Sequence, residues 1–119
     1  MTKALLVSMV FILTITITIS CSKSNNGGGT TTVDCSTVTN KAFAADVSSI
    51  IQNSCAQSGC HNSGSGNGPG ALTNYTQIAG AASTIRSSVS SGRMPKSGSL
   101  TTTQKNSIIC WIDNGAPNN

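Results

Sequence analysis

Apolar residues recur at helical spacing in three stretches of the chain, and the first runs from about Thr39 to Asn53. Its apolar side chains occur at positions i, i+4, i+7 and i+8, which places them on one face of an α-helix. These residues are Phe43, Val47, Ile50 and Ile51. The pattern predicts an amphipathic helix that ends just before Cys55.

The second stretch begins near Thr73 and Asn74, a pair typical of a helix N-cap, and we expect it to stop at Gly92. The third opens after Leu100 with a threonine cap and ends before Gly115. The apolar residues of these two stretches are Tyr75, Ile78, Ala82, Ile85, Val89, Ile108, Ile109, Trp111 and Ile112. No stretch carries a convincing hairpin signal, so the sequence predicts an all-α fold of about three short helices.

The N-terminus has the layout of an export signal. Lys3 precedes an apolar run over residues 4–13, and the segment ends in the small residue Ser20. A transmembrane segment is the alternative, but the uncharged stretch is marginal in length and rich in Ser and Thr. We therefore expect residues 1–20 to be a signal peptide.

Thr18, Ile19 and Ser20 resemble the end of a bacterial lipoprotein signal, after which Cys21 would receive the lipid. The alternative is that Cys21 pairs in a disulfide of an ordinary secreted protein. The polar, Gly-rich continuation predicts a flexible tether over residues 21–33, and residues 34–119 form the domain.

Composition narrows the possible functions. The chain has 119 residues, 37% of them hydrophobic and 8% charged, with a net charge of +4, which provides for one small domain and excludes a two-domain enzyme. The basic residues are scattered, so no nucleic-acid partner is expected. Paired-carboxylate catalysis is improbable because the three acidic residues lie far apart: Asp34, Asp46 and Asp113. We expect no enzymatic activity and no small-molecule substrate.

The side chains best suited to bind a cofactor or a metal occur together within residues 55–61, namely Cys55, Cys60 and His61. Two thiols beside an imidazole can add to the two vinyl groups of a haem and place the histidine under the iron. The usual spacing has two residues between the cysteines, whereas this chain has four. A Cys55–Cys60 disulfide is the alternative in an exported protein.

A haem iron needs a second axial ligand, and Met94 is the one methionine left after signal removal. A methionine in a surface loop is the alternative role. A His/Met pair favours reduced iron and raises the potential, and it leaves no axial position for a substrate.

With these residues the chain resembles a monohaem class I cytochrome c, in particular the small lipoprotein cytochromes of Bacteroidetes-type bacteria with a long cysteine spacer. The resemblance covers about residues 33–119. It implies a cytochrome c-like fold around one covalent haem c, with Cys55 and Cys60 as thioether donors and His61 and Met94 as iron ligands. The carbonyl of Pro69 is expected to orient His61.

The resemblance also implies that the first and last helices pack together, so that Cys35 and Cys110 form a disulfide. A buried free thiol at Cys110 is the alternative. Trp111 is expected to fill space against the porphyrin. Four basic residues are expected near the haem edge, where they serve the propionates or an acidic partner, unless they form a solvated face: Arg86, Arg93, Lys96 and Lys105.

Three functions remain open. The first is an exported, lipid-anchored electron carrier that faces the periplasm or the exterior and meets redox partner proteins. The second is a Cu(I) site made by soft ligands. The third is a structural lipoprotein held by two disulfides. The copper site would use Cys55, Cys60, His61 and Met94.

Overall fold

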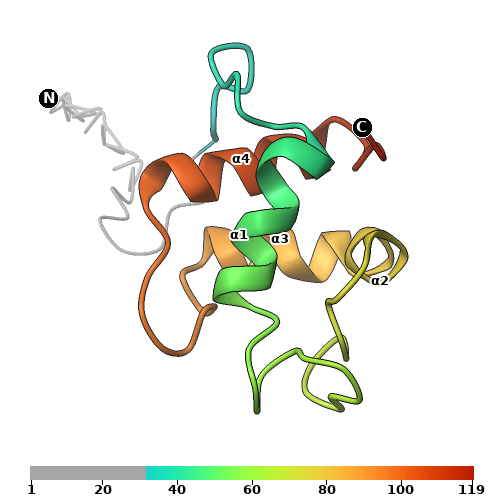
Figure 1. Ribbon diagram of the computed structural model, residues 1–119. Coiled ribbons are helices and arrows are strands. Elements are labelled where there is room, and N and C mark those ends of the chain that lie inside the picture. Colours follow the sequence, from blue (N-terminus) through green and yellow to red (C-terminus); the bar gives the residue numbers. More distant parts are fainter. Residues whose placement is uncertain (1–31) are drawn as a thin grey trace, which may run out of the picture.

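The computed structural model describes residues 32–119 and is built from helices, with no strand in this range (Figure 1). The all-α prediction is therefore confirmed. The predicted signal peptide, Cys21 and nearly all of the predicted tether lie outside the described residues. The helices are a π-helical turn η1 (Phe43–Val47), α1 (Ser48–Ser54), α2 (Tyr75–Gly80), α3 (Ala82–Ser90) and α4 (Thr102–Asp113).

The first helix begins at Phe43 rather than at about Thr39. Its first turn is wide because the amide of Val47 donates to the carbonyl of Ala42, five residues earlier, at 3.1 Å. Oδ2 of Asp46 accepts from the amide of Ala42 at 3.0 Å. The amide of Phe43 donates to the side chain of Asn119 at 2.8 Å. Asn119, which lies 76 residues later in the sequence, therefore accepts from a backbone amide that has no partner within the first turn of the helix.

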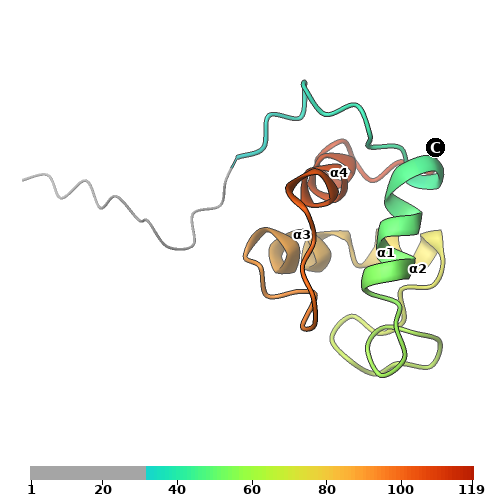
Figure 2. The ribbon, with the colours of Figure 1, turned by 60° about the vertical axis from the view of Figure 1, so that its left-hand side comes forward.

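The second predicted helix is divided in two, so the prediction of one continuous helix is wrong. The amide of Ala81 is shared between the carbonyls of Gln77 at 3.1 Å and Ile78 at 3.2 Å, and α2 ends there. Gly80 explains the break, since glycine is among the poorest helix formers. In Figure 1 α2 is seen nearly end-on while α3 lies across the view, and Figure 2 reverses this, so the two helices run in different directions.

The predicted helix ends are confirmed at three places. The side chain of Asn74 accepts from the amide of Gln77 and caps α2. Thr101 and Gln104 form a reciprocal capping box at the start of α4. α3 ends before Gly92, whose φ of +70° is the left-handed conformation that glycine adopts readily.

The core lies between η1, α1, α3 and α4, and α4 contacts both α3 and η1. Ile51, Ile78, Ile108 and Trp111 are fully buried. The Trp111 ring lies against Phe43 with ring centroids 5.4 Å apart, and its indole N–H donates to the carbonyl of Pro117.

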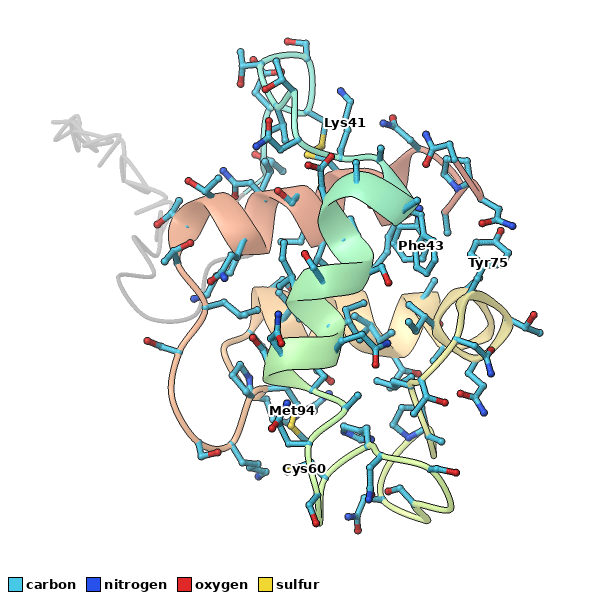
Figure 3. All side chains as sticks on the ribbon, viewed as in Figure 1. Lys41, Phe43, Cys60, Tyr75 and Met94 are labelled. Carbon is cyan, nitrogen blue, oxygen red and sulfur yellow. A yellow bond between two sulfur atoms is a disulfide. The ribbon has the colours of Figure 1, made fainter. Side chains whose placement is uncertain are left out.

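Cys35 and Cys110 form a disulfide with their Cα atoms 5.3 Å apart, which confirms the expected pairing and excludes a free thiol at Cys110. Nζ of Lys41 donates to the carbonyl of Cys35 at 2.6 Å beside this bridge (Figure 3). The disulfide joins the segment before the first helix to the fully buried Cys110 of α4. Within residues 32–119, no helix has both the length and the apolar character needed to span a bilayer.

Candidate functional site

A cavity of about 550 Å³ opens at the end of the molecule where α1 stops. Its walls come from the C-terminal end of α1 with the segment after it, the loop before α2, one face of α3, and residues 93–97. Met94 and Cys60 both lie at this end, whereas Phe43 and Tyr75 lie away from it (Figure 3). The cavity brings together the candidate site residues of the domain: Cys55, Cys60, His61, Pro69 and Met94.

Cys55 is the residue at which α1 ends, and its amide still bonds to the carbonyl of Ile51 at 2.8 Å. The chain then makes a turn in which the amide of Cys60 donates to the carbonyl of Gln57 at 2.9 Å. The amide of His61 donates back to the carbonyl of Cys55 at 3.1 Å, which closes the loop. The four spacer residues are therefore absorbed in a compact loop, and Cys55 and His61 stay adjacent.

Cys55 and Cys60 are free thiols and do not form the alternative disulfide. Cys55 is 9% exposed, while Cys60 is half-buried. Burial raises the pKa of the Cys55 thiol, and the nearby Cys60 adds to this effect. A raised pKa favours the protonated form of the Cys55 thiol.

His61 is 7% exposed, and its ring is held by a hydrogen bond of 2.9 Å between Nδ1 and the carbonyl of Gly70. A carbonyl can only accept, so the hydrogen of the neutral ring is on Nδ1 and the lone pair is on Nε2. The amide of Leu72 also donates to the carbonyl of His61, at 2.8 Å. Hydrogen bonds with Gly70 and Leu72 thus fix both the ring and the backbone of His61. Nε2 is left as the ring nitrogen available to a ligand.

The partner of His61 corrects one expectation, because the acceptor is Gly70 and not Pro69. The amide of Gly70 donates to the carbonyl of Asn67 at 2.9 Å, so Pro69 lies inside a tight turn. The chain returns to the imidazole only after that turn, at Gly70, whose φ is +88°. Pro69 itself lines the cavity.

Met94 lies in the segment after α3, half-buried, and lines the cavity. Its amide donates to the carbonyl of Ser88 at 3.1 Å. The hydroxyl of Ser88 accepts from the guanidinium of Arg93 at 2.9 Å. Ser88 therefore holds the methionine segment against α3 at two points, a role that no sequence pattern indicates.

The cavity lining contains two cations and no carboxylate. Arg93 and Lys96 line it. Arg86 does not, because it pairs with Asp113 of α4 at 2.5 Å, and Lys105 also lies elsewhere. Of the four basic residues expected near a haem edge or on a solvated face, two therefore line the cavity and two do not.

Trp111 is likewise absent from the cavity wall, so the expectation that it packs against a porphyrin is wrong. Its indole ring packs against Phe43 in the core, and its N–H donates to the carbonyl of Pro117. The apolar part of the wall comes instead from side chains of α3 and the two loops: Leu72, Ile85, Val89, Met94 and Pro95.

Comparison of the chain with protein-family models, curated proteins and solved structures found no match.

Proposed function

We propose that the domain is an electron carrier with one haem c bound covalently in this cavity. The observation that carries the proposal is that Cys55, Cys60 and His61 line one cavity together with Met94, which comes from a separate segment of the chain. When bound, a haem c supplies reversible one-electron chemistry at its iron.

The cavity fits such a group in size and chemistry. Its volume of about 550 Å³ falls in the range of small-molecule and cofactor sites. Its wall is mainly apolar, as a porphyrin requires. Arg93 and Lys96 provide positive charge for the two propionates, and no carboxylate in the wall opposes them.

Each candidate residue has a role in holding the group. The thiols of Cys55 and Cys60 are free, as addition to vinyl groups requires. Each sulfur would form a bond to one vinyl carbon while the thiol hydrogen passes to the other carbon, so no oxidant is needed. Nε2 of His61 and the thioether sulfur of Met94 would ligate the iron.

One observation favours this function over a structural lipoprotein with two disulfides. The free state of Cys55 and Cys60 argues against a scaffold with a second disulfide there.

The path of the chain supports attachment through Cys21 to a membrane. Residues 32–42 lie at the end of the molecule beside α4, and the 55–70 segment lies at the opposite end in both views (Figures 1 and 2). A lipid anchor on Cys21 would therefore enter the domain at the end opposite the cavity, and the predicted flexible tether would leave the cavity free to meet redox partner proteins.

The test is a visible spectrum of the exported protein, made together with a c-type maturation system, before and after dithionite. Sharp reduced bands that remain with the polypeptide after acid-acetone extraction support the proposal. A colourless protein from cells that mature another c-type cytochrome would refute it. Cys55→Ala/Cys60→Ala is the control that retains His61 and Met94 but has no thioether donor.

A further inference from the structure

The backbone of the long spacer is held by two side chains of the glycine-rich loop that follows, and one of them, Asn67, also lines the cavity. Nδ2 of Asn67 donates to the carbonyl of Gly59 at 2.9 Å and to that of Cys60 at 3.1 Å. The hydroxyl of Ser65 also donates to the carbonyl of Cys60. Three hydrogen bonds therefore converge on the carbonyls of Gly59, the last spacer residue, and Cys60.

These contacts answer a geometric problem of this chain. With four residues between Cys55 and Cys60, the spacer has two more residues than the usual thioether motif. The extra length must be placed without moving the Cys60 sulfur away from the cavity. Gly59, with a φ of +75° and no atom within 4 Å of an added Cβ, lets the loop turn outward.

We propose that Asn67 and Ser65 are positioning residues for Cys60, which hold the spacer so that its thiol reaches the second vinyl group of the haem. This inference rests on the proposed function and deepens it. Asn67 and Ser65 touch the backbone of the spacer and act through Cys60. The same loop continues into Gly70, which holds His61, so one loop sets both the second thiol and the imidazole.

Two features of the loop support this role. The amide of Asn67 itself donates to the hydroxyl oxygen of Ser65 at 3.2 Å, so the two positioning side chains are also linked to each other. Asn62 and Ser63 lie in the same loop and make no side-chain hydrogen bond to the spacer, so the contacts are specific to positions 65 and 67.

The experiment counts thioether bonds in the loaded protein. Intact mass measures total covalent haem, and the pyridine haemochrome band distinguishes a haem with one remaining vinyl group from one with none. In Asn67→Ala we expect attachment through Cys55 to persist while the fraction of single-thioether haem rises roughly tenfold, because two hydrogen bonds to the spacer are lost. Asn67→Asp keeps the shape but cannot donate, so it should lose the second thioether at least as often.

The controls separate positioning from folding. Asn62→Ala and Ser63→Ala should attach haem through both thioethers, as the unchanged chain does. Ser65→Ala should lose the second thioether more often, whereas Ser65→Thr, which keeps the hydroxyl, should retain it. Removing Gln57 and Ser58 from the Asn67→Ala chain leaves the usual two-residue spacer, so it should recover both thioethers. Cys60→Ala provides the single-thioether reference spectrum.

Two results would overturn the inference. One is full double attachment in Asn67→Ala at the yield of the unchanged chain. The other is a loss of all haem from Asn67→Ala that the shortened spacer does not recover, because Asn67 would then be needed for the fold. Absence of covalent haem from the unchanged chain would instead refute the proposed function, so the two failures are distinguishable.

Discussion

The imidazole of His61 donates from Nδ1 to the carbonyl oxygen of Gly70, at 2.9 Å. This bond fixes both the tautomer and the direction of the ring, and it leaves Nε2 as the nitrogen available to a ligand. It depends on a backbone conformation with a positive φ at Gly70.

Gly70→Ala should therefore strain this turn. An alanine in the left-handed region costs roughly 1–2 kcal/mol, and the added Cβ would lie 3.5 Å from the carbonyl oxygen of Ser65. We expect the loaded protein to lose about that much stability in urea unfolding. Gly66→Ala is the matched control, because Gly66 has neither a positive φ nor an atom within 4 Å of an added Cβ. Equal stability of the two variants would contradict the argument.

Met94→Leu tests the proposal that Met94 is the second ligand of the iron. Leucine has a similar volume but no sulfur, so we expect covalent haem to remain while the weak far-red band of the oxidised protein disappears. The potential should fall, because a His/Met pair favours reduced iron. Redox titration and the oxidised spectrum measure both effects. Ser97→Ala, in the same wall segment, should change neither. A far-red band that survives in Met94→Leu would exclude Met94 as a ligand.

Cys35→Ala/Cys110→Ala removes the disulfide. The bridge closes a sequence separation of 75 residues, for which the chain-entropy model gives roughly 4 to 5 kcal/mol. We expect the free energy of unfolding of the loaded protein to fall by about that amount in guanidinium titrations. Reduction of the unchanged protein should shift the midpoint equally, since thioether bonds to haem are not reduced by thiols. An unchanged midpoint in both experiments would refute this estimate.

The ion pair between Arg86 and Asp113 predicts a small pH dependence of stability. Hydrogen bonding by the Arg86 guanidinium lowers the pKa of Asp113 from its ordinary value of 3.8. A carboxyl with a lowered pKa in the folded state contributes stability above its unfolded pKa, and the contribution is lost as the pH falls through the folded pKa. Because both side chains are more than a third exposed, the contribution is below about 1 kcal/mol.

Asp113→Asn should therefore be slightly less stable than the unchanged chain at about pH 7 and equally stable at about pH 2. Thermal unfolding at the two pH values measures this. Asn114→Ala, on the next residue of the chain, is the control for changes at the end of α4. A difference that persists at low pH would show that Asp113 acts through something other than its charge.

The sequence predicts well what depends on local chemistry and periodicity. Asn74 and Thr101 cap helices as expected, because a side chain that accepts from an amide three residues later is a local contact. The buried stripes follow from helical spacing. The Cys35–Cys110 disulfide is long-range, and family resemblance is what predicts it.

The contacts that the sequence does not predict are made by loop residues, whose positions depend on the path of the loop in space. Gly70 rather than Pro69 meets His61 because the intervening turn sets the register, and the sequence carries no periodic signal for it. The contacts of Asn67 and Ser88 are hidden for the same reason, since polar residues in loops can face many directions. The break of the second helix at Gly80 had a visible signal, a glycine inside the stripe.

The disulfide also decides how the domain bears mechanical load. A pull on the chain from its N-terminal side reaches Cys35 first, and the covalent bridge passes the force directly into the buried middle of α4. The segment between Cys35 and the first helix is shielded from tension, so α1 is not peeled from the core. If the proposed N-terminal anchor is present, such a pull enters the domain through α4, the longest of the described helices, while the cavity lies at the far end.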